Sequence, residues 1–292
     1  MRRTQLFVRA GSIALRSGSL WAVALAVALV NWLAGQVLSG VGIGTTILSQ
    51  VVSIATYAFL TGALIRQVNA IADGQAVNAA DAFRNGARAY LPMLLLGVVL
   101  AIPTFLFNLL LGPVFTGMMV DQLGPQAGSL SRISAVQLYT LCLGLPLLFV
   151  GYLLVMLLVS ALGVGSERAV ALEQAGVGAA LGRGWRLIKS RLSDFVVIGL
   201  IMLSIGLAVG ILLACPIMLI SMGQVIQAGV NSDYTSIVAG MSRYSGIFSI
   251  AGTLVVVPFT ILFSGVWTLA FRRWQGKDAA AIDPLSAPFP PA

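Results

Sequence analysis

Long apolar runs and short polar segments alternate along the whole chain. Six runs each hold the roughly 20 mostly apolar residues that a helix needs to cross a bilayer, and none of them contains Asp, Glu, Lys or Arg. The pattern predicts an all-α, polytopic membrane protein with six transmembrane helices. The predicted spans are Leu20 to Ser39, Thr45 to Leu64, Leu91 to Leu111, Val136 to Gly163, Phe195 to Ser221 and Ile247 to Phe271.

The basic residues between these runs indicate an orientation. Of the 17 Lys and Arg residues, all but Arg132 and Arg243 lie before the first span, between the second and third, between the fourth and fifth, or after the sixth. Cytoplasmic segments of membrane proteins collect Lys and Arg. We therefore expect a multi-pass protein of a bacterial inner membrane with both termini cytoplasmic. Residues 1–275 form the predicted membrane domain, and the proline-rich residues 276–292 a disordered cytoplasmic tail.

An amphipathic cytoplasmic segment precedes each odd-numbered span. Before the third span, Phe83, Ala87 and Tyr90 share one helical face. Arg84 and Arg88 lie on another face. The pattern predicts three interfacial helices, each with its apolar face in the acyl region and its basic residues at anionic headgroups. The corresponding residues are Leu6, Ala10, Ile13, Arg9 and Arg16 before the first span, and Val177, Leu181, Trp185, Ile188, Arg183, Arg186 and Lys189 before the fifth.

Two of these segments also align with each other. Residues 82–88 (AFRNGAR) match residues 180–186 (ALGRGWR) without a gap. Three units of interfacial helix, outward span and return span account for all six spans, and each unit starts on the same side. This favours a parallel threefold repeat rather than an inverted one. The alternative to a repeat is that the segments are alike only because any cytoplasmic loop of a membrane protein collects Arg and an amphipathic pattern. Within the second unit, Asn78 and Asp81 resemble a capping box.

The segment from Glu173 to Lys189, EQAGVGAALGRGWRLIK, leads directly into the fifth span. It resembles a motif of bacterial six-helix membrane proteins, a group that includes the membrane domain attached to some glycerophosphoryl diester phosphodiesterases. In that family, too, an Ala, a basic residue, Trp, Leu and Lys precede the fifth span. Gly184 stands where the family often has Ser. The resemblance implies a fold and no activity, because the histidines of the phosphodiesterase chemistry are missing from this sequence.

Composition supports the membrane assignment and narrows the chemistry. With 59% hydrophobic and 9% charged residues, the chain has too few charges to coat a soluble globule. The net charge of +8 comes without a basic, aromatic-rich motif, so we expect no nucleic-acid partner. The absence of histidine excludes His-based nucleophile systems and imidazole-ligated zinc. Cys142 and Cys215 lie alone in apolar runs, so we expect no metal and no cofactor.

A few polar and small residues inside the spans are candidate functional positions. Asn31 lies near the predicted bilayer midplane, and Gln50 and Asn108 lie closer to the outer interface. They are read either as ligands of a solute or as interhelical hydrogen-bonding groups, and the second reading is favoured. Gly206 and Gly210 form a GxxxG element that permits close helix packing. Pro103, Pro146, Pro216 and Pro258 interrupt four spans.

The favoured function is a non-catalytic membrane scaffold, assembly partner or lipid-associated module. Its expected partners are a bilayer with anionic headgroups and either another membrane protein or a second copy of the chain. The alternative is a permease or channel for a neutral or lipid-like solute, which the apparent lack of ionisable groups in the spans argues against in its ion-coupled form. An enzyme ranks third, because nothing in the sequence pairs Glu167, Glu173 or Asp194 into a site.

Overall fold

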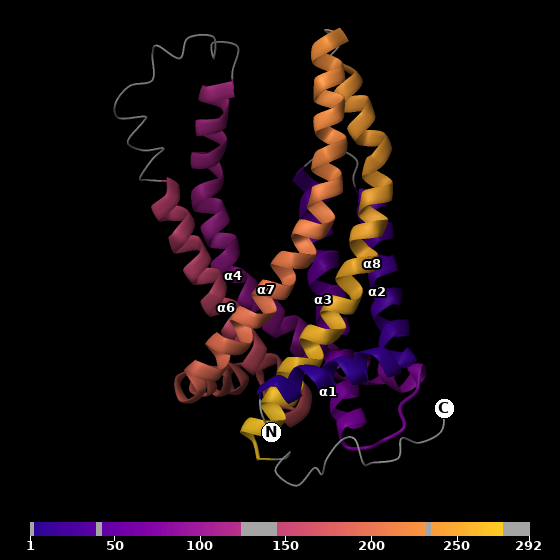
Figure 1. Ribbon diagram of the computed structural model, residues 1–292. Coiled ribbons are helices and arrows are strands. Elements are labelled where there is room, and N and C mark those ends of the chain that lie inside the picture. The colour runs from indigo at the N-terminus through magenta and orange to yellow at the C-terminus, as the bar shows by residue number, and fades with distance from the viewer. Residues whose placement is uncertain (1–2, 39–42, 124–144, 232–234, 277–292) are drawn as a thin grey trace.

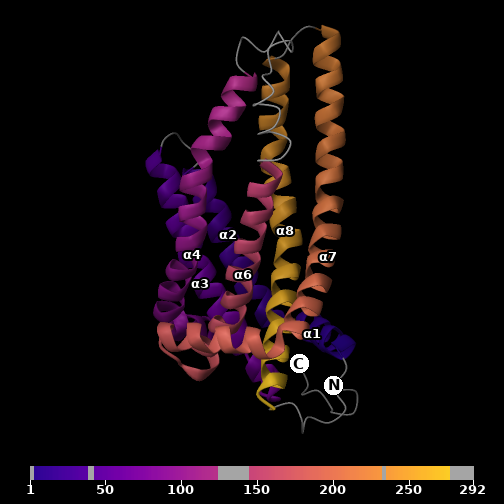
Figure 2. The same cartoon turned by 90° about the vertical axis from the view of Figure 1, so that its left-hand side faces the viewer.

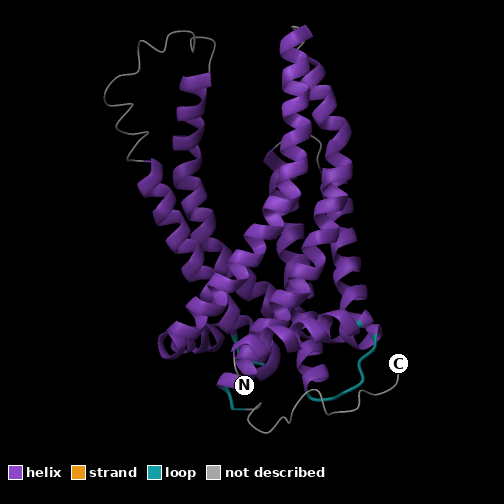
Figure 3. Cartoon of the chain, viewed as in Figure 1, coloured by secondary structure: helices purple, strands orange, loops and turns teal. Residues whose placement is uncertain are grey.

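The computed structural model describes residues 3–38, 43–123, 145–231 and 235–276, and all secondary structure in this part of the chain is helical (Figures 1 and 3). Five stretches are long and apolar enough to cross a membrane: Gly18–Val37, Gln50–Ala72, Ala79–Phe107, Val150–Glu173 and Val177–Leu212. The chain is therefore a membrane protein by fold class. The helices are α1 Arg3–Arg16, α2 Gly18–Leu38, α3 Ile43–Ala72, α4 Ala79–Leu123, α6 Leu145–Glu173, α7 Val177–Asn231 and α8 Thr235–Trp274.

The helices converge at one end, which we call the base of the bundle. The base contains α1, the connections 73–78 and 174–176, and the C-terminal end of α8 (Figure 1). Towards the opposite end, α4 and α6 diverge from α7 and α8 (Figure 1). The principal neighbours are α3 with α4, α6 with α7 and α2 with α3, followed by α1 with α8 and α4 with α6. Each return helix thus packs against a segment that begins at the base.

At the base the helices extend further than the apolar runs predict. Helix α3 continues to Ala72 and α6 to Glu173, although the predicted spans end at Leu64 and Gly163. Arg66, Glu167 and Arg168, which follow the apolar runs in sequence, therefore belong to helices α3 and α6. The end of an apolar run indicates where a helix leaves an apolar environment. The helix itself continues as long as its polar groups find hydrogen-bond partners.

At the opposite end, residues 223–246, which separate the predicted fifth and sixth spans, are largely helical, because α7 ends at Asn231 and α8 begins at Thr235. Pro146 is the second described residue of α6. Several parts of the prediction lie outside the described residues: Arg132, residues 136–144 of the predicted fourth span with Cys142, and the tail 277–292.

Local sequence sets several helix ends at the base. The capping box predicted before the third span is confirmed, because the backbone N–H of Asp81 donates to Asn78 Oδ1 at 2.8 Å and that of Asn78 to Asp81 Oδ2 at 3.5 Å. After α3, Gly74 has φ of +76°, a conformation that glycine adopts without strain. Arg191 breaks the helical geometry within α7 (φ −132°, ψ 29°). This kink separates residues 177–190 from the membrane span that follows.

Residues 79–90 of α4 and 177–190 of α7, which we call the entry segments, bury small side chains. Ala82 and Ala89 in α4 and Ala180 in α7 are fully buried. The faces predicted from larger residues pack on the bundle only in part: Phe83 and Trp185 are both more than 40% exposed, whereas Ile188 is 7% exposed and belongs to a hydrophobic core cluster. In α1, by contrast, the predicted stripe is buried, with Leu6 and Ala10 each 1% exposed.

The reason for the small side chains is the closeness of neighbouring helices. A Cβ atom added at Gly184 would lie 2.9 Å from the Leu162 carbonyl oxygen and 2.5 Å from Ser166 Oγ. At Gly86 it would lie 2.9 Å from the Phe59 ring and 3.1 Å from the Ala63 side chain. Gly184, the position where the resembled family often has Ser, has no space for a side chain in this fold.

We expect Gly184→Ala to destabilise the protein by about 1–3 kcal/mol, because the added methyl group meets backbone atoms of α6 that have little freedom to move. Gly182→Ala is the matched control, since nothing lies within 4 Å of a Cβ at that position, and it should stabilise the segment by about 0.5–1 kcal/mol. Thermal unfolding of the detergent-solubilised protein measures both. A melting temperature of Gly184→Ala at or above that of wild type would contradict the packing described.

Candidate functional site

A buried ion pair lies inside the bundle near its base. Glu167 and Arg168 are adjacent residues of α6, and Arg168 Nη1 lies 3.1 Å from Glu167 Oε2. The side chain of Arg168 is 1% exposed and that of Glu167 12%. Arg168 also donates to the Val164 carbonyl oxygen at 3.0 Å. Such a pair is retained only where partners compensate for the water that both charges lose.

Three helices enclose this pair. The Tyr57 hydroxyl, from α3, donates to Glu167 Oε1 at 3.2 Å, although half of the Tyr57 side chain is exposed. A Cβ at Gly163 would touch both Leu100 of α4 and Glu167 Oε1, so the carboxylate lies against a tightly packed wall. Tyr57 therefore connects the surface of the bundle to a charge in its interior.

Further buried polar atoms near the base have no hydrogen-bond partner among the described residues. Arg168 Nε is one of them, and both amide atoms of the fully buried Gln67 are others. An unsatisfied buried polar group costs about 1–3 kcal/mol. Several such groups in one layer distinguish the base of the bundle from an ordinary hydrophobic core. The other such atoms near the base belong to Ser166, Ser264, Trp267, Thr268 and Gln275.

A second set of charges joins the ends of α3 and α8. Arg272 is 4% exposed, and its guanidinium lies 2.6 Å from Asp73 Oδ1 and donates to Asn69 Oδ1 at 2.6 Å. Arg9 of α1 donates to the Ala72 carbonyl oxygen at 3.4 Å. Basic side chains thus donate hydrogen bonds to the free carbonyl oxygens at the C-terminal end of α3, where the helix dipole favours positive charge.

The basic residues predicted at lipid headgroups have several different environments. Arg183 forms an ion pair with Glu173 at 3.1 Å, and Glu173 also accepts from Gln275 Nε2. Arg186 donates to the Gly182 carbonyl oxygen of its own helix. Lys189 Nζ lies 5.1 Å from the centre of the Trp185 ring. Arg16, Arg84 and Arg88 are exposed.

The predicted intramembrane positions that the structure describes have different environments. The Thr56 hydroxyl of α3 donates to Asn31 Oδ1 of α2 at 2.6 Å, which is the interhelical role favoured for Asn31. Gln50 is exposed, and the side chain of Asn108 is not described. A Cβ at Gly206 would contact Phe259 of α8 at 3.3 Å, whereas nothing lies within 4 Å of Gly210. Of the two glycines, Gly206 alone lies at a helix contact among the described residues.

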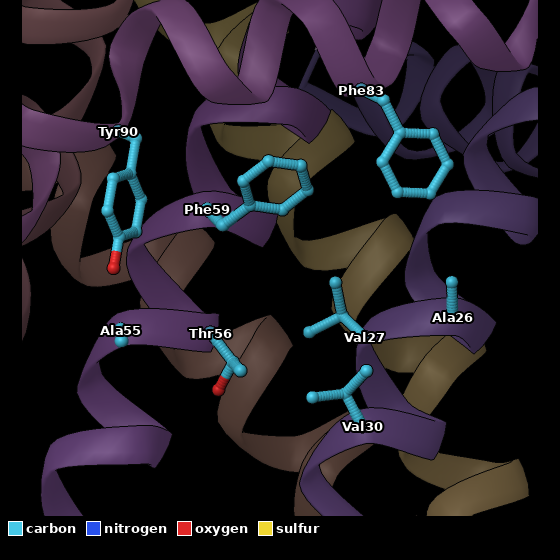
Figure 4. A pocket seen from close by; sticks show the side chains of 8 residues that line it. All are labelled: Ala26, Val27, Val30, Ala55, Thr56, Phe59, Phe83 and Tyr90. Carbon is cyan, nitrogen blue, oxygen red and sulfur yellow. The ribbon is translucent and has the colours of Figure 1, made fainter.

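Thr56 also lines a groove of about 340 Å³ between α2, α3 and α4 (Figure 4). Phe83 and Tyr90 extend into it from the entry segment of α4, on either side of Phe59 (Figure 4). The face of this segment that the sequence assigned to the acyl region is therefore a wall of the groove. The other lining residues are Ala26, Val27, Val30 and Ala55.

Sequence reasoning missed the Tyr57–Glu167–Arg168 cluster because it assigned both charges to a cytoplasmic loop. One feature of the sequence was available: the charges in Gly163-Val-Gly-Ser-Glu-Arg-Ala-Val-Ala171 are flanked on both sides by small residues, as in a closely packed helix. The partner Tyr57 had no comparable pattern, because it comes from a helix 110 residues earlier.

The described residues form an all-helical membrane protein (Figure 2). Buried charges and other buried polar groups lie near its base. The chain belongs to the DUF7847 family, a domain of unknown function whose family model matches residues 1–274. No curated protein and no solved structure matches the chain. The resemblance to the membrane domain of phosphodiesterases stays a prediction, since the family match does not bear on it.

Removing one member of the buried ion pair should cost far more than removing both. We expect Arg168→Met to destabilise the protein by about 3–5 kcal/mol, since it leaves the Glu167 carboxylate buried without its cation. The double variant Glu167→Gln/Arg168→Met should regain most of that loss. Arg183→Gln, in the exposed pair with Glu173, should cost less than about 1 kcal/mol.

Unfolding of the purified protein in increasing dodecyl sulfate measures these differences. Losses that simply add in the double variant would show that the two side chains do not stabilise each other.

Proposed function

We propose that six helices of this chain cross a bacterial inner membrane and that the base of the bundle faces the cytoplasm. The sixth span would be the apolar part of α8, over residues 247–271. Two observations support this topology: α1 and the end of α8 lie at the same end of the bundle (Figure 1), and the basic residues of the described chain concentrate there. Cytoplasmic interfaces favour Lys and Arg.

Single cysteines in a variant with Cys142 and Cys215 replaced by Ala test this topology. A membrane-impermeant maleimide applied to intact cells should label a Ser129→Cys variant, which lies in a predicted outer loop. It should leave Gln75→Cys, in the exposed connection between α3 and α4, unlabelled until the membrane is permeabilised. Labelling of Gln75→Cys in intact cells would reverse the orientation.

The three predicted units of interfacial helix, outward span and return span belong to the same proposal. Their support is the matching contact pattern. Gly86 and Gly184, equivalent in the gapless alignment, each face two residues four positions apart on the preceding return helix. Ala10 of α1 has a similar place, because a Cβ at Gly265 of α8 would lie 3.3 Å from it. The third contact joins the first unit to the last and closes the bundle.

We infer that the chain acts as a membrane scaffold and lipid-associated module. The observation that carries this proposal is how charge is used at the base. Arg272 with Asp73 joins α8 to α3, which are 199 residues apart at these positions, and Arg183 with Glu173 joins the start of α7 to the end of α6, so the charges serve to hold helices together. A base fixed in this way gives a stable platform, and the diverging outer helices leave apolar faces for lipid or a partner, as at Leu154 and Leu207.

Native mass spectrometry of the protein, extracted directly into polymer-bounded membrane discs, tests the scaffold proposal. A defined assembly with a second copy or a stoichiometric membrane-protein partner, together with retained anionic lipid, is expected. A lone, lipid-free monomer would contradict it.

One observation favours the alternative, a permease. The argument against ion-coupled transport was that the spans lack ionisable groups, and Glu167 and Arg168 lie within the apolar stretch Val150–Glu173. Intramembrane charges of this kind often mark transport pathways. The scaffold proposal predicts that proteoliposomes swell in glycerol, and collapse an imposed pH gradient, no faster than empty liposomes. If glycerol flux or proton flux is observed, and Glu167→Gln or Asn31→Ala reduces it, the scaffold proposal is rejected in favour of the permease.

A further inference from the structure

We propose that the groove between α2, α3 and α4 binds one acyl chain of an anionic phospholipid from the cytoplasmic leaflet, whose phosphate is held by Arg84. The inference rests on the proposed function for its orientation and deepens it, because it names the lipid class and the site. It follows from the chemistry of the groove, from its depth and from the position of one exposed arginine.

The wall of the groove suits a hydrocarbon chain. Its lining is aliphatic and aromatic apart from the hydroxyls of Thr56 and Tyr90. The Thr56 hydroxyl is occupied, since it donates to Asn31 Oδ1 at 2.6 Å and lies 2.8 Å from the Val52 carbonyl oxygen. The inner part of the wall therefore presents no unsatisfied donor to an apolar occupant, while its volume of about 340 Å³ lies within the usual range for small-ligand sites.

The inner end of the groove lies about one leaflet deep, although the lining on α2 itself covers only Ala26 to Val30, about 6 Å along the helix. Its outermost members, Phe83 and Tyr90, belong to the entry segment at the base, and its deepest member on α2 is Val30. Val30 lies ten residues beyond Leu20, the first residue of the predicted span, which corresponds to about 15 Å along a helix. Half of a bilayer core of about 30 Å is the same distance. A chain that enters at the base thus ends near the bilayer midplane.

An exposed arginine on the entry segment of α4 supplies the charge. Arg84 follows Phe83 directly, so its side chain lies about 100° around the helix from the groove wall, on the face opposite the buried Ala82 and Gly86. Its long side chain is able to reach an interfacial phosphate beside the groove, as arginines at membrane surfaces do. Asp81, the carboxylate of this segment, is already engaged with the backbone N–H of Asn78.

Arg88 provides a contrast on the same helix. It is also exposed, but it lies about 140° around the helix from Phe83, further from the groove wall than Arg84. The two exposed arginines have the same charge and lie about one turn apart on the same helix, so they differ in their angle to the groove.

Photocrosslinking of the full chain in lipid nanodiscs tests the proposal. The probe is phosphatidylglycerol with a diazirine in one acyl chain, and phosphatidylcholine with the same label is the neutral comparison. Crosslinks mapped by mass spectrometry should concentrate on Val27, Val30 and Phe59 with phosphatidylglycerol. Arg84→Gln should reduce them about fivefold, the factor that one arginine contributes at an anionic surface, whereas Arg88→Gln should leave them unchanged.

A second variant fills the groove with a larger side chain. Ala26→Phe should remove the crosslinks with both lipids, and an unchanged melting temperature confirms that the variant is folded. Equal crosslinking by the two lipids, equal effects of the two arginine variants, or crosslinks spread over the outer face of α2 would each overturn the proposal. So would crosslinks between two protein copies through the groove, which would make a second chain its occupant.

The outcome is distinguishable from a failure of the proposed function. If native mass spectrometry finds the assembly but the groove shows no crosslinks, only the lipid site is rejected. If the chain is a lone, lipid-free monomer and the groove is also unlabelled, both proposals fail.

Discussion

The close approach of α6 and the entry segment of α7 is the contact on which the polar base depends. At Gly165 an added Cβ would lie 2.8 Å from the Gly184 Cα atom, so the two backbones touch without intervening side chains. This contact lies directly before Glu167 and Arg168 in α6. Because the entry segment lies flat against the helix, it helps to exclude water and lipid from the ion pair. Any larger residue at either glycine would separate the helices.

The burial of the ion pair has consequences for the rest of the fold. Two charges removed from water are costly unless each finds hydrogen-bond partners. Here the partner of Glu167 is Tyr57 of α3, and the partner of Arg168 is the Val164 carbonyl oxygen of α6 itself. The pair therefore fixes the relative position of α3 and α6, while Arg272 and Asp73 do the same for α3 and α8. Helix α3 takes part in both arrangements, which makes it the central element of the base.

The two sides of α3 have different chemistry. One side contributes Tyr57 to the charged interior, and the other contributes Thr56 and Phe59 to an apolar groove. Adjacent residues of a helix point about 100° apart, so a single helix is able to serve both environments. A rigid, charge-tied base beside a lipid-accessible groove is consistent with a protein that organises its membrane surroundings. In such a protein, binding of lipid does not require the base to rearrange.

Composition and hydrophobic pattern by themselves determined the membrane class, the helical architecture and the capping box at Asn78, because each depends on local residue type or on spacing along one helix. They also identified Asn31 as an interhelical hydrogen-bonding residue, though not its partner Thr56. The tertiary structure alone decided which charges are buried. Glu167 and Arg168 look like loop residues in sequence, and only contact with helices from elsewhere in the chain makes their burial tolerable.

The same holds for the entry segments, where tertiary packing buries the small residues Ala82 and Ala180 and leaves the bulky Phe83 and Trp185 more than 40% exposed. Hydrophobicity along one helix predicts that an apolar face will leave water, but lipid and protein are equally apolar neighbours. In a membrane, shape therefore decides which face meets the bundle: Ala82 and Gly86 fit against α3, and Phe83 remains for the groove. The sequence determined that these segments lie at an apolar boundary, and the packing of helices decided what each face touches.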